Sequence, residues 1–152
     1  MKTEKKYGKS KAVALDTWIK LARASATFGK KSDESIRSFG LTSAQFAVIE
    51  VLGHLGDLSV GKLCEKMLVT GGNMTLVLDN LEKQNLVVRI PNPTDRRAIN
   101  ISLTPNGKKL FKEIFIKHAA NIENTMSVLS ESEQIQLGVL LKKLGVGIKD
   151  NS

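Results

Sequence analysis

The chain is short and strongly basic. Its 152 residues are 41% hydrophobic, enough for one packed core, and 23 lysines and arginines against 15 acidic residues leave a formal net charge of +8. This charge favours a nucleic acid or another anionic surface as a partner. A single cysteine excludes an internal disulfide framework. No apolar run reaches the length of a membrane span and the N-terminus carries no apolar signal region, so we expect a cytoplasmic protein.

The first 38 residues divide into a basic tail and a helical region. Residues 1–11 carry five lysines, and either a solubilising terminus or an arm that contacts DNA would explain them. From residue 12 onwards, apolar residues such as Leu15 and Trp18 recur at helical spacing. Residues 29–32 interrupt this spacing, so the sequence leaves open whether residues 12–38 form one kinked helix or two pieces.

Three further helices are predicted between residues 42 and 84. Thr42 followed by Gln45 is a capping-box pattern, and the helix that it opens is apolar on more than one side, so this helix should be central. Ser59 opens a short amphipathic helix, and a turn then leads into a second one at residues 70–84. The core-facing stripe of this last helix consists of Met74, Val77, Leu78 and Leu81.

Residues 86–103 read as a β-hairpin. Alternation predicts one apolar face made of Leu86, Val88, Ile90, Ile99, Ile101 and Leu103. The prolines and Asx residues between the two runs favour a turn, and Arg96 and Arg97 follow at its tip. A hairpin directly after a helix looks like the wing of a winged helix-turn-helix, whose arginines can enter a minor groove. A solvated hairpin with stray charges is the alternative.

The C-terminal third is predicted to be two helices. Thr104 and Pro105 supply an N-cap and a first helical residue for a long helix, which should end at about Leu129. Ser130 and Glu133 form a second capping box, which opens the last helix. The apolar stripes at both ends of the chain exceed what a small core can cover. A helical dimer interface would cover these stripes, whereas packing within one subunit is the alternative.

Three segments together are similar to the MarR family of bacterial and archaeal transcription regulators. They read LTSAQFAVI at 41–49, VLDNLEKQNLVVR at 77–89 and PNPTDRRAINISLTPNGKKL at 91–110. The resemblance covers about residues 12–146 and implies a mostly α-helical protein with a small β-hairpin wing. A single domain would span residues 12–147, before a C-terminal tail at 148–152. Within this domain we expect a winged helix-turn-helix core at 42–104 and dimerisation helices at 12–38 and 105–147.

The resemblance also implies which residues contact DNA. In the recognition helix these are Thr70, Gly71, Gly72, Asn73, Thr75 and Leu76. In the wing, Arg97 would enter the minor groove, Arg96 would contact phosphate and Asp95 would brace an arginine. Many relatives carry basic residues at the positions of Leu76 and Asn80, and Asp79 lies beside them. Binding should therefore depend less on basic residues of the recognition helix, and more on the wing, the tail and apolar contact with thymine methyl groups.

We expect a homodimeric, sequence-specific regulator that binds two half-sites of double-stranded DNA and responds to a small apolar or aromatic effector. Trp18 and Phe46 are candidates for the effector site, although both are better explained as core residues. A winged-helix interaction module, or a nonspecific DNA-binding protein without ligand sensing, is the alternative. No motif indicates an enzyme, a cofactor or a metal site. Cys64 lies on an apolar stripe and is interpreted as a buried hydrophobe rather than a redox sensor.

Overall fold

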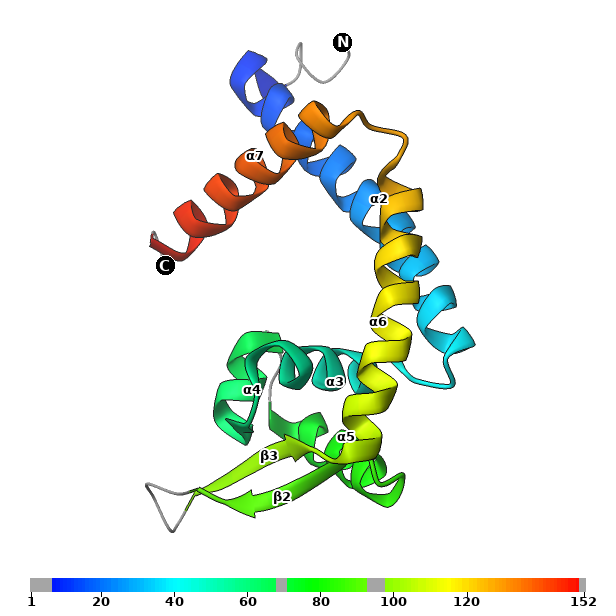
Figure 1. Cartoon of the computed structure of the whole chain (residues 1–152). Helices are drawn as coiled ribbons and strands as arrows, with labels where there is room; N and C mark the ends of the chain where they lie inside the picture. Colours follow the sequence, from blue (N-terminus) through cyan, green and yellow to red (C-terminus); the bar gives the residue numbers. More distant parts are fainter. Residues whose placement is uncertain (1–6, 68–70, 93–97, 151–152) are drawn as a thin grey trace. The chain divides into compact units, whose positions relative to one another are not determined.

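The computed structural model describes residues 7–67, 71–92 and 98–150. Its elements are, in chain order, α2 (Lys9–Ser38), α3 (Ser43–Leu55), β1 (Leu58–Ser59), α4 (Val60–Met67), α5 (Gly71–Lys83), β2 (Val87–Pro91), β3 (Ile99–Leu103), α6 (Pro105–Met126) and α7 (Glu131–Asp150) (Figure 1). Two compact units divide the chain, Met1–His118 and Ala119–Ser152. The predicted fold class, mostly helical with a small hairpin wing, is confirmed. Within the described residues, no helix has the length and apolar character needed to span a membrane.

The N-terminal helix α2 is one continuous helix of 30 residues. It begins at Lys9, inside the region predicted to be a tail, and it runs through Gly29 without a break. A glycine in a helix interior costs only about 1 kcal/mol relative to alanine, so its neighbours can keep the helix intact. The interpretation of Trp18 as a core residue is wrong for the single chain, because this side chain is 62% exposed.

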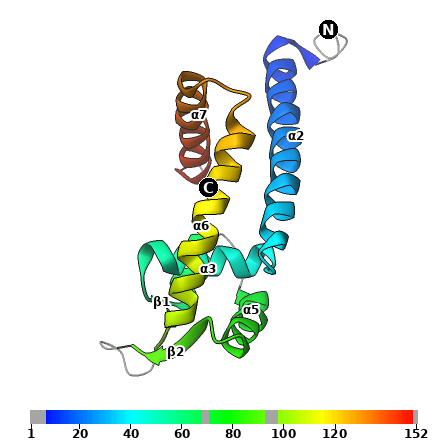
Figure 2. The ribbon, with the colours of Figure 1, turned by 45° about the vertical axis from the view of Figure 1, so that its right-hand side comes forward.

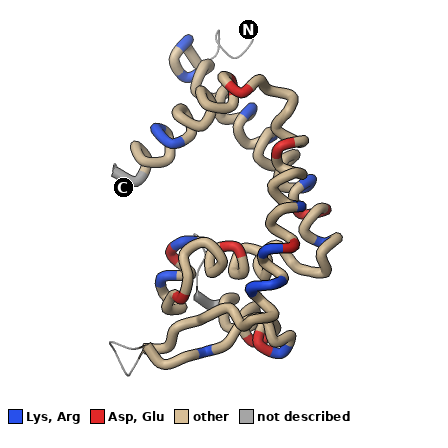
Figure 3. Tube along the Cα trace, viewed as in Figure 1, with Lys and Arg blue, Asp and Glu red and all other residues tan. Residues whose placement is uncertain are grey.

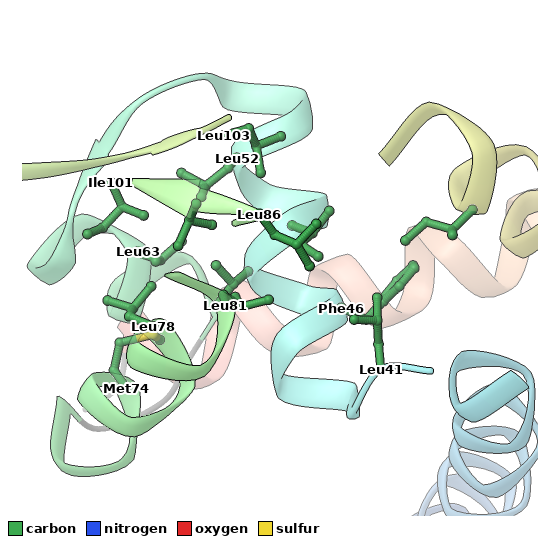
Figure 4. Packing of buried hydrophobic residues seen from close by; sticks show 14 of the residues in the cluster. Leu41, Phe46, Leu52, Leu63, Met74, Leu78, Leu81, Leu86, Ile101 and Leu103 are labelled. Carbon is green, nitrogen blue, oxygen red and sulfur yellow. The ribbon is translucent and has the colours of Figure 1, made fainter. Parts of the chain in front are cut away.

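The core of the first unit is built around α3. Val48 and Ile49 of this helix are completely buried, and they pack in one cluster with Leu63 of α4, Leu81 of α5 and Ile101 of β3 (Figure 4). The central position predicted for α3 is therefore confirmed, as is the burial of Phe46. Its capping box is also present. Thr42 Oγ1 accepts from the backbone N–H of Gln45 at 3.2 Å, and the Thr42 N–H donates to Gln45 Oε1 at 2.9 Å.

The wing strands belong to a three-stranded antiparallel sheet with the order β1-β3-β2. Strand β1, in which Leu58 faces Ile101 and Ser59 faces Asn100, was not predicted. Two residues are too few to show an alternating pattern, so β1 is defined only by its pairing with β3. Since β3 is the middle strand, β2 is an edge of the sheet.

The predicted burial is right for Ile101 and Leu103 of β3, but Ile99 is 52% exposed, and the predicted face is wrong for β2. Val87 pairs with Leu103 and Arg89 pairs with Ile101, so Val87 and Arg89 share the face of the buried β3 residues. Val87 is 2% exposed, whereas Val88, which was expected on this face, is 38% exposed. Leu86 is buried, but it precedes the strand. Counting Leu86 as a strand residue shifted the alternation by one position, and a one-residue shift reverses both faces.

The second unit contains the second predicted capping box. Ser130 N–H donates to Glu133 Oε2 at 2.8 Å, and Glu133 N–H donates to Ser130 Oγ at 3.4 Å. The hydrogen bond from the Ser130 side chain holds the pKa of Glu133 below its ordinary value. Helix α6 ends at Met126, three residues earlier than predicted. The side chain of Gln134 in α7 donates to the carbonyls of Met126 and Leu129. Neither carbonyl has a partner four residues further along within α6, because the helix ends at Met126.

A corner of backbone hydrogen bonds connects α5 to the wing and to α6. Asn85 adopts φ 54°, and the N–H groups of Asn85 and Leu86 donate to the Glu82 and Leu81 carbonyls at 2.9 Å each. This is a Schellman ending, in which a residue in the left-handed region closes the helix. Thr104 then donates through its N–H to Leu86 O and through its hydroxyl to Asn85 O, at 3.1 and 2.7 Å.

At this corner, Gly107 lies very close to the backbone of Leu86. Its N–H donates to Thr104 Oγ1 at 3.0 Å, and the residue is buried. A Cβ atom at this position would lie 2.0 Å from the carbonyl oxygen of Leu86. Only glycine lets the first turn of α6 lie against the end of α5, because backbone atoms cannot move aside as a flexible side chain can.

Replacing Gly107 with alanine should therefore destabilise the fold. We expect Gly107→Ala to lower the free energy of unfolding by about 3 kcal/mol, at the upper end of the usual cost of overpacking. Gly29→Ala is the matched control, because a Cβ at Gly29 meets nothing within 4 Å. This control should gain about 0.5–1 kcal/mol, since alanine is the better helix former. Urea unfolding at equal protein concentrations measures both, and equal midpoints for the two variants would contradict the close approach.

Candidate nucleic-acid interface

Helix α5 has one buried side and one exposed side. Met74, Leu78 and Leu81 are 2% exposed or less and pack into the core. Asn73 and Thr75 are exposed, and Leu76 is 60% exposed. The helical projection made from the sequence is confirmed for these positions. The first turn of α5 contains Gly71 and Gly72, whereas Thr70, the other residue predicted at this end, lies outside the described residues.

The hairpin of β2 and β3 begins next to α5 and extends away from it (Figures 1 and 2). Near its end, Asn92 N–H donates to the Ala98 carbonyl at 3.0 Å, and Asn92 Nδ2 donates to Asn100 Oδ1 at 3.1 Å. These bonds hold the two ends of the connecting segment next to each other. Asp95, Arg96 and Arg97, the residues predicted at the tip, lie outside the described residues.

Arg89 joins the wing to α5. Its Nη2 donates to Asp79 Oδ1 at 2.6 Å, and its Nη1 donates to Glu82 Oε2. Hydrogen bonding to Asp79, with a further contribution from Glu82, raises the pKa of Arg89 above its ordinary value. This contact was not predicted, because the alternation that put Val88 and Ile90 on the apolar face put Arg89 on the outer face of β2. Asp79 was expected beside the DNA-facing side of α5, and the structure shows its carboxylate paired.

Exposed lysines lie on α4 and α6, on either side of α5 in the chain. Lys62 and Lys66 are exposed on α4, one turn apart, and the start of α6 carries Lys108, Lys109 and Lys112 (Figure 3). Helix α5 itself has one lysine, Lys83, beside its two carboxylates. The prediction that α5 carries little positive charge is therefore correct. The lysines of α4 were not predicted as a site, although their spacing of four residues indicates one helical face.

A cluster of aromatic rings lies between α3 and α6. The rings of Phe46 and His118 are 4.5 Å apart, and His54 meets Phe115 at the same distance. His118 Nδ1 is buried and has no hydrogen-bond partner among the described residues. Of the two predicted effector-site residues, Phe46 belongs to this cluster, whereas Trp18 is exposed on α2.

Cys64 is less buried than predicted. It packs against the core from α4 but is only partly buried. No group of three or more histidine, cysteine, aspartate or glutamate side chains in the described part of the chain could hold a metal ion.

Comparisons with known proteins agree with this architecture. A profile described as the MarR family matches residues 39–98. The chain is 37% identical over 136 residues to the HTH-type transcriptional regulator MhqR of Bacillus subtilis, covering 90% of this chain and 94% of MhqR. The crystal structure of YusO from Bacillus subtilis matches with 31% identity and a TM-score of 0.61, covering 90% of this chain and 97% of YusO.

NadR, crystallised in complex with 4-hydroxyphenylacetate, matches with 27% identity and a TM-score of 0.71, covering 83% of this chain and 89% of NadR. The matched residues 39–98 include α3, α4, α5 and β2. The chain belongs to the MarR family of winged helix-turn-helix, DNA-binding transcription regulators.

Proposed function

We propose that this protein is a homodimer that reads two half-sites about one helical turn apart and leaves DNA when a small aromatic effector binds. The observation that carries this proposal is the exposed side of α5, where Asn73, Thr75 and Leu76 face solvent beside the hairpin. The protein acts by binding rather than by catalysis, in the cytoplasm.

In this proposal α5 lies in the major groove. Asn73 is suited to an adenine edge, Thr75 to a phosphate or a base, and Gly71 and Gly72 permit close approach of the helix end to the DNA. Leu76 is 60% exposed and packs into no core. Against a thymine methyl group this leucine would bury apolar surface at about 25 cal/mol per Å².

The wing and the flanking lysines supply the remaining contacts. We place Arg97 in the minor groove, Arg96 on a phosphate and Asp95 beside an arginine, since a carboxylate would be repelled by the DNA backbone. Because α5 brings little positive charge, exposed lysines such as Lys62 and Lys66 of α4 are the best additional phosphate contacts.

Dimerisation accounts for the apolar surface that the single chain leaves exposed. In α2 this surface consists of Val13, Leu15, Trp18 and Ile19. In α7 it includes Ile135, Val139, Leu140, Leu141 and Leu144. Apolar surface on this scale is unusual for a monomer, and a second copy of the chain can cover it symmetrically.

The effector is proposed to bind against the Phe46–His118 pair. Two aromatic rings 4.5 Å apart can stack on a further ring, and the buried His118 Nδ1 can hydrogen-bond a polar group of a ligand. The likeness to NadR, whose crystal structure contains 4-hydroxyphenylacetate, supports an aromatic effector with a polar group.

The contact between Leu76 and thymine can be tested on an operator selected from a randomised DNA pool. Replacing the implicated T with deoxyuridine removes only the methyl group and should weaken binding about fourfold, as expected for about 0.8 kcal/mol per buried carbon. Leu76→Ala should lose this preference. Arg97→Ala is the control, because it should weaken binding to both operators by about 1–3 kcal/mol and leave their ratio unchanged. Fluorescence anisotropy measures the affinities, and equal binding of T and deoxyuridine by the unmodified protein would refute the contact.

The dimer interface can be tested with two leucines of similar exposure. Leu140 on α7 is 63% exposed and Leu76 on α5 is 60% exposed. Leu140→Glu should produce monomers, because it places a charge in the proposed interface, whereas Leu76→Glu should remain dimeric. Sedimentation velocity at micromolar concentration measures both. Trp18, the single tryptophan, should shift its emission to longer wavelength in the monomeric variant only. A dimeric Leu140→Glu protein would place the interface elsewhere.

The effector site can be tested with the two histidines of the aromatic cluster. His118→Phe keeps a ring but removes the buried nitrogen, so about tenfold more 4-hydroxyphenylacetate should be needed to release the operator, the loss expected for one hydrogen bond to a charged group. His54→Phe is the control and should respond as the unmodified protein does. Affinity for DNA without the ligand should be the same in both variants. Equal responses to the ligand would show that His118 does not bind the effector.

A further inference from the structure

The side chain of Arg89, on the wing strand β2, makes two ion pairs with α5. One guanidinium nitrogen lies 2.6 Å from Asp79, and the other donates to Glu82. The backbone N–H of Arg89 also donates to Glu82 Oε1, at 3.4 Å. Since β2 is an edge strand, this N–H lies on the side of the strand that no other strand pairs with. Arg89 therefore meets α5 through both its backbone and its side chain.

The contacted carboxylates lie on the same side of α5 as a proposed DNA contact. Asp79 follows Thr75 by four residues and Glu82 follows Asp79 by three, a spacing that places them one above the other on a helix. Their side chains are 44% and 40% exposed. Half-exposed carboxylates next to a DNA-binding surface would repel the phosphate backbone across a short distance.

The charge of α5 depends on Arg89. The helix has two acidic residues, Asp79 and Glu82, and one basic residue, Lys83, so its formal charge is −1. Together with Arg89, these side chains have a net formal charge of zero. A guanidinium can hold two carboxylates at once with a planar arrangement of donors, whereas a lysine ammonium is a single point charge.

We propose that Arg89 is a positioning residue that neutralises Asp79 and Glu82 and holds the recognition helix at a set position relative to the wing. The affinity of α5 for DNA then depends on a residue outside this helix. This inference rests on the proposed function, because it requires both α5 and the wing to contact the same DNA.

The first test is removal of the guanidinium. Arg89→Met should lower operator affinity about tenfold, within the range of coupling measured between contacting charged groups. The loss should shrink as salt is raised, because the repulsion between the freed carboxylates and the phosphates is screened. Arg89→Lys keeps the charge without the two-point contact. This variant should recover part of the affinity and still discriminate T from deoxyuridine under Leu76 less well than the unmodified protein does.

Neutralising the carboxylates distinguishes positioning from direct DNA contact. Asp79→Asn with Glu82→Gln should change affinity less than about twofold when Arg89 is present, because the carboxylates are already paired. The same two substitutions should restore about tenfold when combined with Arg89→Met. Lys83→Met is the control, since Lys83 forms no ion pair in the described structure. The two substitutions should not restore the affinity that Lys83→Met loses.

The outcomes separate this inference from the proposed function. If Arg89→Met binds as the unmodified protein does, or if the triple variant binds as weakly as Arg89→Met, the inference is overturned; the second result would make Arg89 a DNA contact itself. Leu76→Ala and Arg97→Ala are measured beside them. If neither of these changes binding, the proposed interface is wrong as well. Urea unfolding of each variant, with a stoichiometric titration of its DNA-binding-competent fraction, ensures that the affinities of folded proteins are compared.

Discussion

The carbonyl oxygen of Leu86 is the point on which the arrangement of the DNA-binding unit depends. It accepts the Thr104 N–H at 3.1 Å, and the bare Cα of Gly107 lies so close that a Cβ would come within 2.0 Å of it. Helix α5 ends at Lys83, three residues before Leu86, the wing strand β2 begins immediately after Leu86, and α6 starts beside Thr104. The contacts around this oxygen thus set the relative positions of α5, β2 and the start of α6. This packing explains Leu103, Thr104 and Gly107 of the segment 91–110, because a residue larger than glycine at position 107 would separate α5 from α6.

A DNA-binding helix is expected to carry positive charge, but most of the positive charge of this unit lies outside α5. The chain has a formal net charge of +8, yet α5 carries more acidic than basic residues. Exposed lysines stand on α4 and at the start of α6, and Arg89 of the wing offsets the acidic residues of α5. Phosphate attraction can therefore come from the flanking elements, which leaves polar and apolar side chains on α5 free to discriminate between bases.

The first and last helices, α2 and α7, expose apolar surface to solvent. Apolar side chains on the first half of α2 and along α7 remain exposed, and Trp18 is among them. By contrast, the core around α3 is almost completely closed to solvent. A sequence can have the apolar spacing of a buried helix face in both places, because the same periodicity serves burial within a chain and burial between chains.

Local signals in the sequence determined most of the elements. The capping boxes at Thr42 and Ser130 mark helix starts through bonds between residues three apart, and the apolar stripe of α5 follows from helical spacing. Asn85 adopts a positive φ at the end of α5, a conformation that asparagine tolerates better than most residues, and this is also a local property. Tertiary structure alone decided the face of β2, the presence of β1, the partners of Arg89 and the exposure of Trp18. Each of these depends on which distant residues meet in space, and a pattern along the chain records only how often apolar residues recur.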